Sequence, residues 1–356
     1  MTRRLKTKTR FGVKILCLLL AGIILAACSA CAGKKNETES ASELSGPAGL
    51  PTVGIKESGE STEDASLPAD ASGEESTAAE GETQTTEEET DEGSSEEEST
   101  KAARTPVHAL TAEEIEEIRS TYDSKVYGFG TGFRHDYVDA YNRPMMVNNM
   151  LAHFAGSDAD IQMYCSSADR KCVAFSFQCG TEYGHTSAVL DILAKYKIKS
   201  TFYIIHSYAE RNRALVERIL GDGHVIGSHT YSCPADGIAR HPLEEQMEDA
   251  MKMQQYMQAS FGYTMTKYNF NSGYWSEQSV IMMSRMGYQV DFCSCNYSDY
   301  DPAATFDTAA LLDDLEQSLH PGCIYCFHTT NVITPTILEP LIEYCLAQGY
   351  RIVQVP

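Results

Sequence analysis

From residue 171 onward, short apolar runs alternate with longer segments whose apolar positions recur every three or four residues. Short runs predict buried strands, and the longer periodicity predicts amphipathic helices. Strands that alternate with helices form a parallel sheet with right-handed crossovers. The predicted fold is therefore α/β, a distorted (β/α) barrel of about seven parallel strands. The expected strands cover residues 173–177, 200–205, 225–229, 268–270, 289–295, 323–328 and 351–355.

Two helix starts carry recognisable capping residues. Thr111 and Glu114 fit a capping box, in which each side chain bonds the other residue's backbone N–H, so a short helix should run to about Ser120. Thr186 is expected to cap the helix that follows the first strand of the barrel. Further helices should cover residues 215–220, 243–260, 278–286 and 335–348, and one should begin near residue 307.

The N-terminus has the pattern of a secretory signal. Basic residues precede a short apolar run over residues 15–27, and Leu25-Ala26-Ala27-Cys28 resembles a lipoprotein cleavage box. We predict that residues 1–27 are removed and that Cys28 is lipidated, which anchors the chain extracytoplasmically to the cell membrane. The alternative is an uncleaved anchor, for which the apolar run is short.

Charge and composition divide the rest of the chain. The formal net charge is −22, and residues 33–104 are rich in Ser, Thr and Glu and contain no aromatic residue. Such a segment cannot bury enough apolar area to fold, so residues 28–105 are predicted to be a disordered acidic tether. Residues 106–170 should form an N-terminal extension packed on a barrel domain of residues 171–356. No basic or aromatic pattern indicates a nucleic-acid partner.

Three short motifs stand at the ends of predicted strands. They are Ser176-Phe177-Gln178-Cys179-Gly180, His229-Thr230-Tyr231-Ser232-Cys233 and Phe327-His328-Thr329. Active sites of barrels lie at the carboxyl ends of the strands, so these motifs should converge on one site.

The order and spacing of these motifs resemble the polysaccharide deacetylase family, the NodB-homology domain of carbohydrate esterase family four. In that family the first two motifs read Thr-Phe-Asp-Asp-Gly and His-Thr-x-x-His. The resemblance, nearest to the subgroup that acts on peptidoglycan muramic acid, implies removal of acetyl groups by a metal-bound water. It places Gln178 at the catalytic base, His328 at the catalytic acid, and Cys179, His229 and Cys233 at the metal ligands.

The exchanged residues leave the activity open. An amide cannot act as a base, and losing general-base assistance costs roughly 10²- to 10⁴-fold in rate; Glu182 is the nearby carboxylate that can substitute. Two cysteines and a histidine are a known ligand set for an open zinc site. Alternatively, Cys179 and Cys233 form a disulfide, which leaves no metal cofactor, or remain free thiols.

Further residues implied by the resemblance shape a substrate groove. The segment 268–273, which includes Asn269, lies where the family has an arginine that orients the base, and it contains no arginine. Tyr274 and Trp275 follow it, and Asp299 and Tyr300 match a later motif. Two functions follow from the resemblance. The first is a degenerate homologue that binds cell-wall glycan, and the second is an active metal-dependent deacetylase of peptidoglycan or another N-acetylated polysaccharide.

Overall fold

The computed structural model describes residues 106–130, 132 and 134–356. Contacts divide the chain into two units, Met1–Asp91 and Glu92–Pro356, and every described residue belongs to the second. The predicted signal peptide, the lipidation site at Cys28 and the acidic tether lie outside the described residues. Within the described part of the chain, no helix is long and apolar enough to cross a membrane.

The described residues form an α/β fold around a curled parallel sheet, which confirms the predicted fold class. Neighbouring strands follow the order β2–β8–β6–β5–β4–β3–β10–β9, and β11 also pairs with β3. All pairs in this sheet are parallel. The strands are β2 (Ile161–Gln162), β3 (Cys172–Cys179), β4 (Thr201–Ile204), β5 (Val225–Ser228), β6 (Lys267–Tyr268), β8 (Gln289–Asp291), β9 (Cys295–Asn296), β10 (Cys323–His328) and β11 (Arg351–Ile352).

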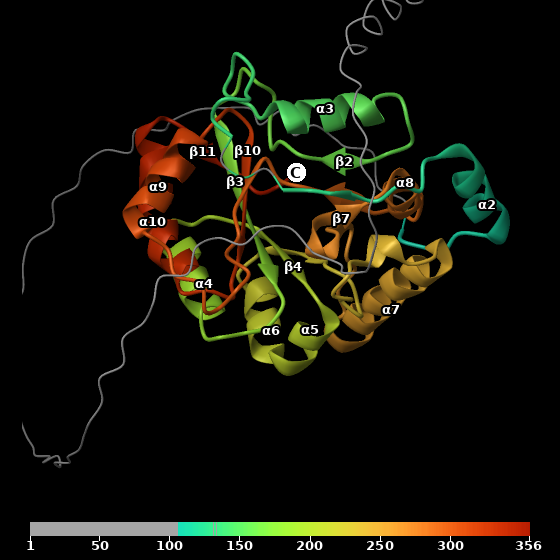
Figure 1. The fold of residues 1–356 in the computed structure, drawn as a ribbon. Helices are drawn as coiled ribbons and strands as arrows, with labels where there is room; N and C mark the ends of the chain where they lie inside the picture. Colours follow the sequence, from blue (N-terminus) through green and yellow to red (C-terminus); the bar gives the residue numbers. More distant parts are fainter. Residues whose placement is uncertain (1–105, 131, 133) are drawn as a thin grey trace, which may run out of the picture. The chain divides into compact units, whose positions relative to one another are not determined.

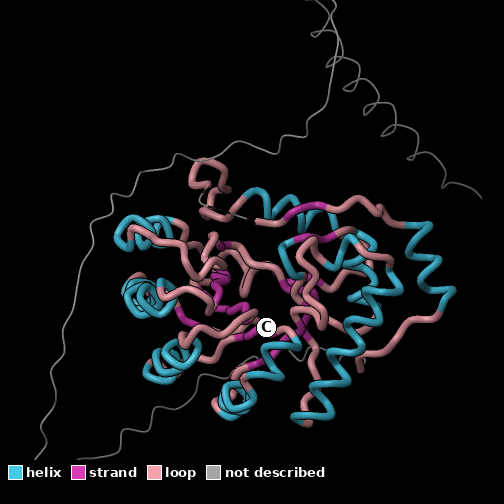
Figure 2. Tube along the Cα trace, turned by 60° about the horizontal axis from the view of Figure 1, so that its bottom comes forward, coloured by secondary structure: helices cyan, strands magenta, loops and turns pink. Residues whose placement is uncertain are grey.

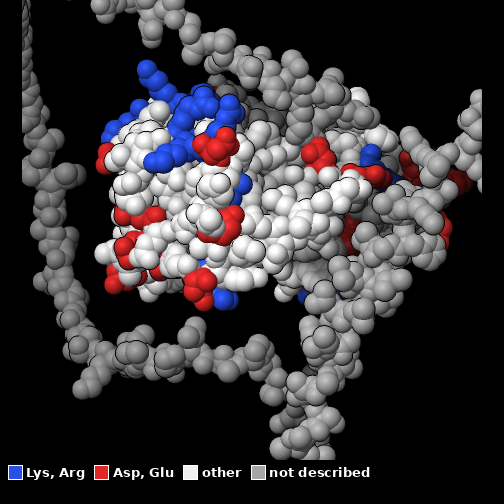
Figure 3. Space-filling view, turned by 90° about the horizontal axis from the view of Figure 1, so that it is seen from above, with Lys and Arg blue, Asp and Glu red and all other residues white. Residues whose placement is uncertain are grey.

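Helices cover the outside of the curled sheet, as Figures 1 and 2 show. They are α4 (Thr186–Lys195), α5 (His206–Arg211), α6 (Arg213–Gly221), α7 (Leu243–Phe261), α8 (Glu277–Arg285), α9 (Thr308–Gln317) and α10 (Ile333–Ala347). Before the sheet come α2 (Ala112–Thr121), β1 (Tyr127–Gly128) and α3 (Met145–Phe154). Strand β1 pairs with β7 (Tyr274–Trp275) in a separate antiparallel ribbon. On the face in Figure 3, most Lys and Arg side chains gather in one area at the upper left, and much of the rest of this face is uncharged.

Alternation along β3 and β10 decides which side chains reach the inside of the barrel. Successive side chains of a strand point to opposite faces. On β3, Phe177 points outward and stacks on Phe202 of β4, with ring centroids 5.0 Å apart. Its neighbour Gln178 points inward and lines a cavity, as does His328 at the end of β10. The outward face therefore supplies the apolar core under the helices, and the inward face supplies the site.

One predicted strand is interrupted, and the interruption closes the barrel. The expected strand 289–295 is two strands, β8 and β9, at different places in the sheet order. Between them the backbone N–H of Phe292 donates to Gln162 O at 2.8 Å, and that of Ser294 donates to Ile324 O at 3.1 Å. The segment Phe292–Ser294, which we call the closing segment, therefore bridges the β2 side and the β10 side of the sheet.

The two predicted helix caps have different outcomes. Thr111 and Glu114 form the predicted capping box at the start of α2. The prediction for Thr186 is wrong, because it is the first residue of α4 and its side chain makes no cap hydrogen bond. Instead the carboxylate of Glu182 accepts hydrogen bonds from the backbone N–H and the hydroxyl of Thr186. Since a carboxylate favours a helix N-terminus, Glu182 takes over the capping role.

Candidate active site

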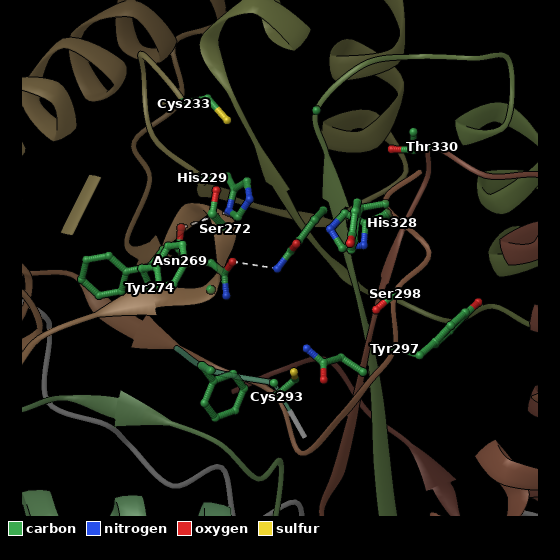
Figure 4. Close-up of a pocket in the computed structure, with 18 of the residues that line it drawn as sticks. His229, Cys233, Asn269, Ser272, Tyr274, Cys293, Tyr297, Ser298, His328 and Thr330 are labelled. Atoms are coloured by element: carbon green, nitrogen blue, oxygen red, sulfur yellow. Dashed lines mark hydrogen bonds between the residues drawn. The ribbon is translucent and has the colours of Figure 1, made fainter. Parts of the chain in front are cut away.

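A cavity of about 800 Å³ opens at the carboxyl ends of the parallel strands. It lies where the sequence predicted that the motifs converge, and its walls come from residues far apart in the chain (Figure 4). The residues lining it include Phe129, Gln178, His229, Cys233, Asn269, Phe270, Tyr274, Cys293, Tyr297, Tyr300 and His328. Carboxamides, imidazoles, thiols and aromatic rings therefore dominate the chemistry that a ligand would meet.

A pair of amides links the position that the resemblance assigns to the base with the segment in which the family has its arginine. The Nε2 of Gln178 donates to Oδ1 of Asn269 at 2.9 Å, drawn as a dashed line in Figure 4. The Nδ2 of Asn269 donates in turn to the backbone oxygen of Asp291 at 2.7 Å. These two bonds fix the orientation of both amides. The pair is neutral and has no group that accepts a proton near neutral pH.

His229 presents an unprotonated nitrogen to the cavity. Its Nδ1 lies 3.0 Å from the backbone oxygen of Asn269. A carbonyl oxygen only accepts, so Nδ1 carries the proton and Nε2 keeps its lone pair. Burial, helped by the charge of His328, lowers the pKa of His229 to about 4, so the ring is neutral at pH 7. Such a ring can accept a hydrogen bond or ligate a metal ion.

His328 keeps a carboxylate partner. Its Nδ1 lies 2.6 Å from Oδ1 of Asp299, whose Oδ2 accepts from the backbone N–H of His328 at 2.8 Å. Burial alone lowers the pKa of His328, but the hydrogen bond and charge of Asp299 outweigh it, and the pKa is raised. Asp299 itself is fully buried. This pair can hold a proton at the cavity, as a catalytic acid must.

Cys179 does not line the cavity. It is the last residue of β3, paired with Ile204, so it faces away from its inward-pointing neighbour Gln178. The hydroxyl of Thr329 donates to its sulfur at 3.4 Å, and the residue is fully buried. Burial raises the pKa of Cys179 to about 12, which keeps it a thiol.

Cys233 lies at the cavity wall but apart from Cys179. Its backbone has a positive φ of 47°, and its N–H donates to Oγ1 of Thr230 at 3.0 Å. Burial raises the pKa of its thiol. Both cysteines are free thiols in the structure, so they do not form the disulfide that was considered.

The residues present do not fit the predicted Cys179/His229/Cys233 zinc site. Among residues 106–130, 132 and 134–356, no group of three His, Cys, Asp or Glu side chains lies close enough to hold a metal ion. The cause is the outward direction of Cys179, which removes one of the three ligands from the cavity. No reaction step on a bound metal is therefore assigned to these residues.

Glu182 does not lie where a substitute base would have to act. Its carboxylate accepts hydrogen bonds from the N–H of Gly184 at 2.6 Å and from the hydroxyl of Tyr208 at 3.2 Å, besides those from Thr186. The side chain is not among those lining the cavity. Its oxygens are therefore committed to the start of α4.

The predicted groove residues divide into two groups. Tyr274 lines the cavity, and so does Tyr300, which is 64% exposed and has its ring 6.1 Å from that of His328. Trp275 is buried, stacks on Tyr127 with centroids 5.1 Å apart and does not line the cavity. Asp299 lies behind His328. The ring of Trp275 also contacts Phe154 of α3 and Phe292 of the closing segment, so Trp275 holds the β1–β7 ribbon on the domain.

Sequence reasoning missed several cavity residues. Cys293 belongs to the closing segment, which was hidden inside a single predicted strand. Phe129 lies in the N-terminal extension, and the backbone of Gly273 accepts a hydrogen bond from its N–H. Neither residue belongs to a motif, and only the mixed composition of residues 289–295 hinted at an interruption.

Comparison with known proteins supports the class that this fold and site define. The model of the family "Polysaccharide deacetylase" matches residues 166–290. The peptidoglycan-N-acetylmuramic acid deacetylase PdaA of Bacillus subtilis is 24% identical over 225 residues, which are 63% of this chain and 81% of that protein. A peptidoglycan-N-acetylglucosamine deacetylase of Bacillus cereus is 34% identical over 91 residues, 26% of this chain and 32% of that protein.

Solved structures agree on the fold. The structure of Bacillus subtilis PdaA, a family 4 carbohydrate esterase, has a TM-score of 0.57 at 21% identity and covers 65% of this chain and 96% of that one. A family 4 carbohydrate esterase from Bacillus anthracis has a TM-score of 0.51 at 20% identity, over 66% and 96% of the two chains. These structures show the fold, and the family match shows that residues 166–290 belong to a polysaccharide deacetylase domain of the NodB, carbohydrate esterase family four type. The resemblance drawn from the motifs is confirmed.

Proposed function

We propose that this chain is a degenerate polysaccharide deacetylase homologue that binds N-acetylated cell-wall glycan and does not hydrolyse it. The observation that carries the proposal is the neutral Gln178–Asn269 pair, bonded at 2.9 Å, which links the position of the base with the segment in which the family has its arginine. Activation of water needs a proton acceptor, and neither amide provides one. The outward direction of Cys179 removes a second element of the hydrolytic site.

The cavity retains what glycan binding requires. Sites for small ligands combine apolar and aromatic walls with a few oriented polar groups. Here Tyr274, Phe270 and Tyr300 offer ring surfaces, and the amides of Gln178 and Asn269 offer hydrogen-bond partners for hydroxyl and acetamido groups. The N-acetylated glycan is inferred from relatives whose names give N-acetylmuramic acid and N-acetylglucosamine residues of peptidoglycan as substrates.

Binding and acetate release, measured on the same samples, test the proposal. We expect chito-oligosaccharides or peptidoglycan fragments to bind the wild-type chain in calorimetry with no acetate released. Tyr274→Ala and Tyr300→Ala should each weaken binding by roughly fivefold, the effect expected for a ring contact of about 1 kcal/mol. Tyr141→Ala is the matched control, since Tyr141 is 55% exposed and lies outside the cavity. Equal affinity in all four proteins contradicts the assigned site.

An active deacetylase is the alternative, and the retained His328–Asp299 pair, bonded at 2.6 Å, is the observation that favours it. A catalytic acid has no use in a protein that only binds. The assay is acetate release with zinc, manganese or cobalt added. Robust turnover by the wild-type chain that disappears in His328→Ala would establish this alternative and refute the binding-only function.

The place of action is part of the proposal. We propose that the mature chain is a lipoprotein anchored through Cys28, because a cleavage box follows a charged start and a short apolar run. In a Cys28→Ser variant the protein should either appear in the medium or remain as an uncleaved precursor. Normal processing with unchanged membrane retention contradicts lipidation. Cys31→Ser is the control, because Cys31 follows the box by three positions.

A further inference from the structure

Two cysteines that the deacetylase frame does not use meet at the base of the cavity. Cys293 lies in the closing segment and lines the cavity, where Figure 4 shows it on the side opposite Cys233. Cys326 lies on β10, two residues before His328, and is buried. The two thiols are hydrogen-bonded to each other. They therefore form a thiol pair with one member reachable from the cavity and the other behind it.

The topology explains why these two residues meet. Cys326 has the same parity on β10 as His328, so its side chain points into the barrel. The closing segment crosses to β10 just there, since Ser294 N–H donates to Ile324 O at 3.1 Å. Cys293 and Cys326 then share a small buried cluster with Ala174 and Ile324. The backbone hydrogen bonds of Phe292 and Ser294, on either side of Cys293, hold the closing segment in place.

We propose that Cys293 and Cys326 are a redox-active dithiol, which an external low-molecular-weight disulfide entering through the cavity converts reversibly into an intramolecular disulfide. The proposal does not rest on glycan binding, because the exchange is tested on the chain without glycan. Since Cys293 lines the same cavity, a bound glycan would obstruct the entry of the external disulfide.

The exchange balances without any further reactant. The pair first loses one proton, and transfer of the remaining proton from Cys293 to Cys326 along their hydrogen bond leaves a thiolate on Cys293. This thiolate attacks one sulfur of the external disulfide, which forms a mixed disulfide and releases one external thiolate. The Cys326 thiolate then attacks the Cys293 sulfur, which forms the intramolecular bond and releases the second external thiolate. The two protons of the protein thiols pass to the two released thiolates. The protein loses two electrons and the external disulfide gains them.

The surroundings of the pair favour its reactivity. A hydrogen bond between the two thiols favours loss of the first proton from the pair, because the remaining S–H can donate to the thiolate. This bond, a hydrogen bond with Ser176 and the charge of His328 lower the pKa of Cys326 despite burial, whereas the same bond and burial raise the pKa of Cys293 well above its ordinary value. Depressed thiol pKa values are typical of cysteines in exchange reactions. Cys345 does not line the cavity and its thiol pKa is not lowered. It is buried on α10, and burial raises the pKa of its thiol to about 12.

The sequence makes the product easy to map. No Lys or Arg lies between Arg285 and Arg351, so one tryptic peptide carries five cysteines, which are Cys293, Cys295, Cys323, Cys326 and Cys345. The full chain would be reduced, freed of reductant without oxygen and treated with oxidised glutathione. Remaining thiols would be alkylated before digestion with trypsin and then chymotrypsin. We expect this peptide to lose two hydrogens, with the link joining Cys293 to Cys326, and a reductant to reverse the change.

Single variants separate the steps. Cys326→Ser should trap glutathione on Cys293, because the resolving thiol is missing. Cys293→Ser should give neither an internal link nor a glutathione adduct on Cys326. The matched control Cys345→Ser should behave like the wild-type chain. A wild-type link that joins other cysteines, or a persistent glutathione adduct on Cys293 while Cys326 stays alkylatable, overturns the proposal.

Discussion

The stability of the domain should depend on pH through His224, a buried residue between α6 and β5. Its Nδ1 accepts a hydrogen bond from the backbone N–H of Ser200 at 3.0 Å, so the neutral ring carries its proton on Nε2. A proton on Nδ1 would set two buried donors against each other. Burial, and after it the charge of Lys199, lowers the pKa of His224 from 6.5 to about 4.

The direction of the pH effect follows from this lowered pKa. Well above pH 6.5 the ring is neutral in both the folded and the unfolded chain. As the pH falls below 6.5 the unfolded chain binds a proton first, so the stability contribution is lost until the pH reaches the folded pKa of about 4. Relative to pH 7.5, the free energy of unfolding should fall by about 2 kcal/mol at pH 5 and by about 3 kcal/mol when the loss is complete.

The variant His224→Asn isolates this contribution. Its side-chain oxygen can accept the Ser200 bond and cannot be protonated in this range. Urea unfolding at pH 7.5 and pH 5 should show that the variant loses about 2 kcal/mol less than the wild-type chain over this interval. Because each protein is compared with itself at the two pH values, the packing cost of the substitution cancels. An equal loss in both proteins refutes the reasoning.

His241→Asn is the control of opposite sign. Hydrogen bonds to Asp236 and then Glu245 raise the pKa of His241 on the protein surface. A raised folded pKa gives stability that is fully present below pH 6.5 and is lost as the pH rises through the folded pKa. Removing His241 should therefore make the loss between pH 7.5 and pH 5 slightly larger.

Three further substitutions test separate parts of the domain. Asp299→Asn should lower the pKa of His328 in an NMR titration, because burial then acts without the opposing carboxylate; an unchanged pKa contradicts the pairing. Lys267→Met leaves the fully buried carboxylate of Asp291 without its cation at 3.1 Å, and should cost about 3–5 kcal/mol in urea unfolding, with partial recovery in a double variant that also carries Asp291→Leu. Thr111→Ala removes the capping box of α2 and should cost about 1 kcal/mol, measured in the same assay.

The sequence predicted the sheet well because periodicity reports burial directly. The strand expected at residues 323–328 is β10 residue for residue, and the helix expected at 243–260 is α7 to within one residue. Local periodicity failed where tertiary structure decides. The segment 289–295, expected to be one strand, contains the closing segment, whose bend is imposed by hydrogen bonds to Gln162 and Ile324, both distant in sequence.

The candidate site was harder to predict because a motif gives spacing but not direction. The resemblance placed Gln178 and Cys179 together at the site as neighbours. In the structure β3 continues through Cys179, so the two side chains face opposite sides of the sheet. The hydrogen bond between Gln178 and Asn269 could not be predicted from the motifs either. It joins residues 91 positions apart, and only the assembled sheet brings them together.

Together, the exchanged residues change the electrostatic character of the cavity. The resemblance implies a hydrolytic site with a metal cation, a carboxylate base and an arginine, whose charges compensate one another. Here Gln178 stands at the position of the carboxylate, it bonds Asn269 in the segment without the arginine, His229 is neutral, and Cys179 points away. Because the carboxylate and the arginine are both replaced by neutral groups, neither is left as a buried charge without its partner. The remaining pair, His328 with Asp299, is compensated within itself. Such a cavity suits an uncharged ligand that is held by hydrogen bonds and ring contacts. The hydroxyl and acetamido groups of a glycan can be held in this way.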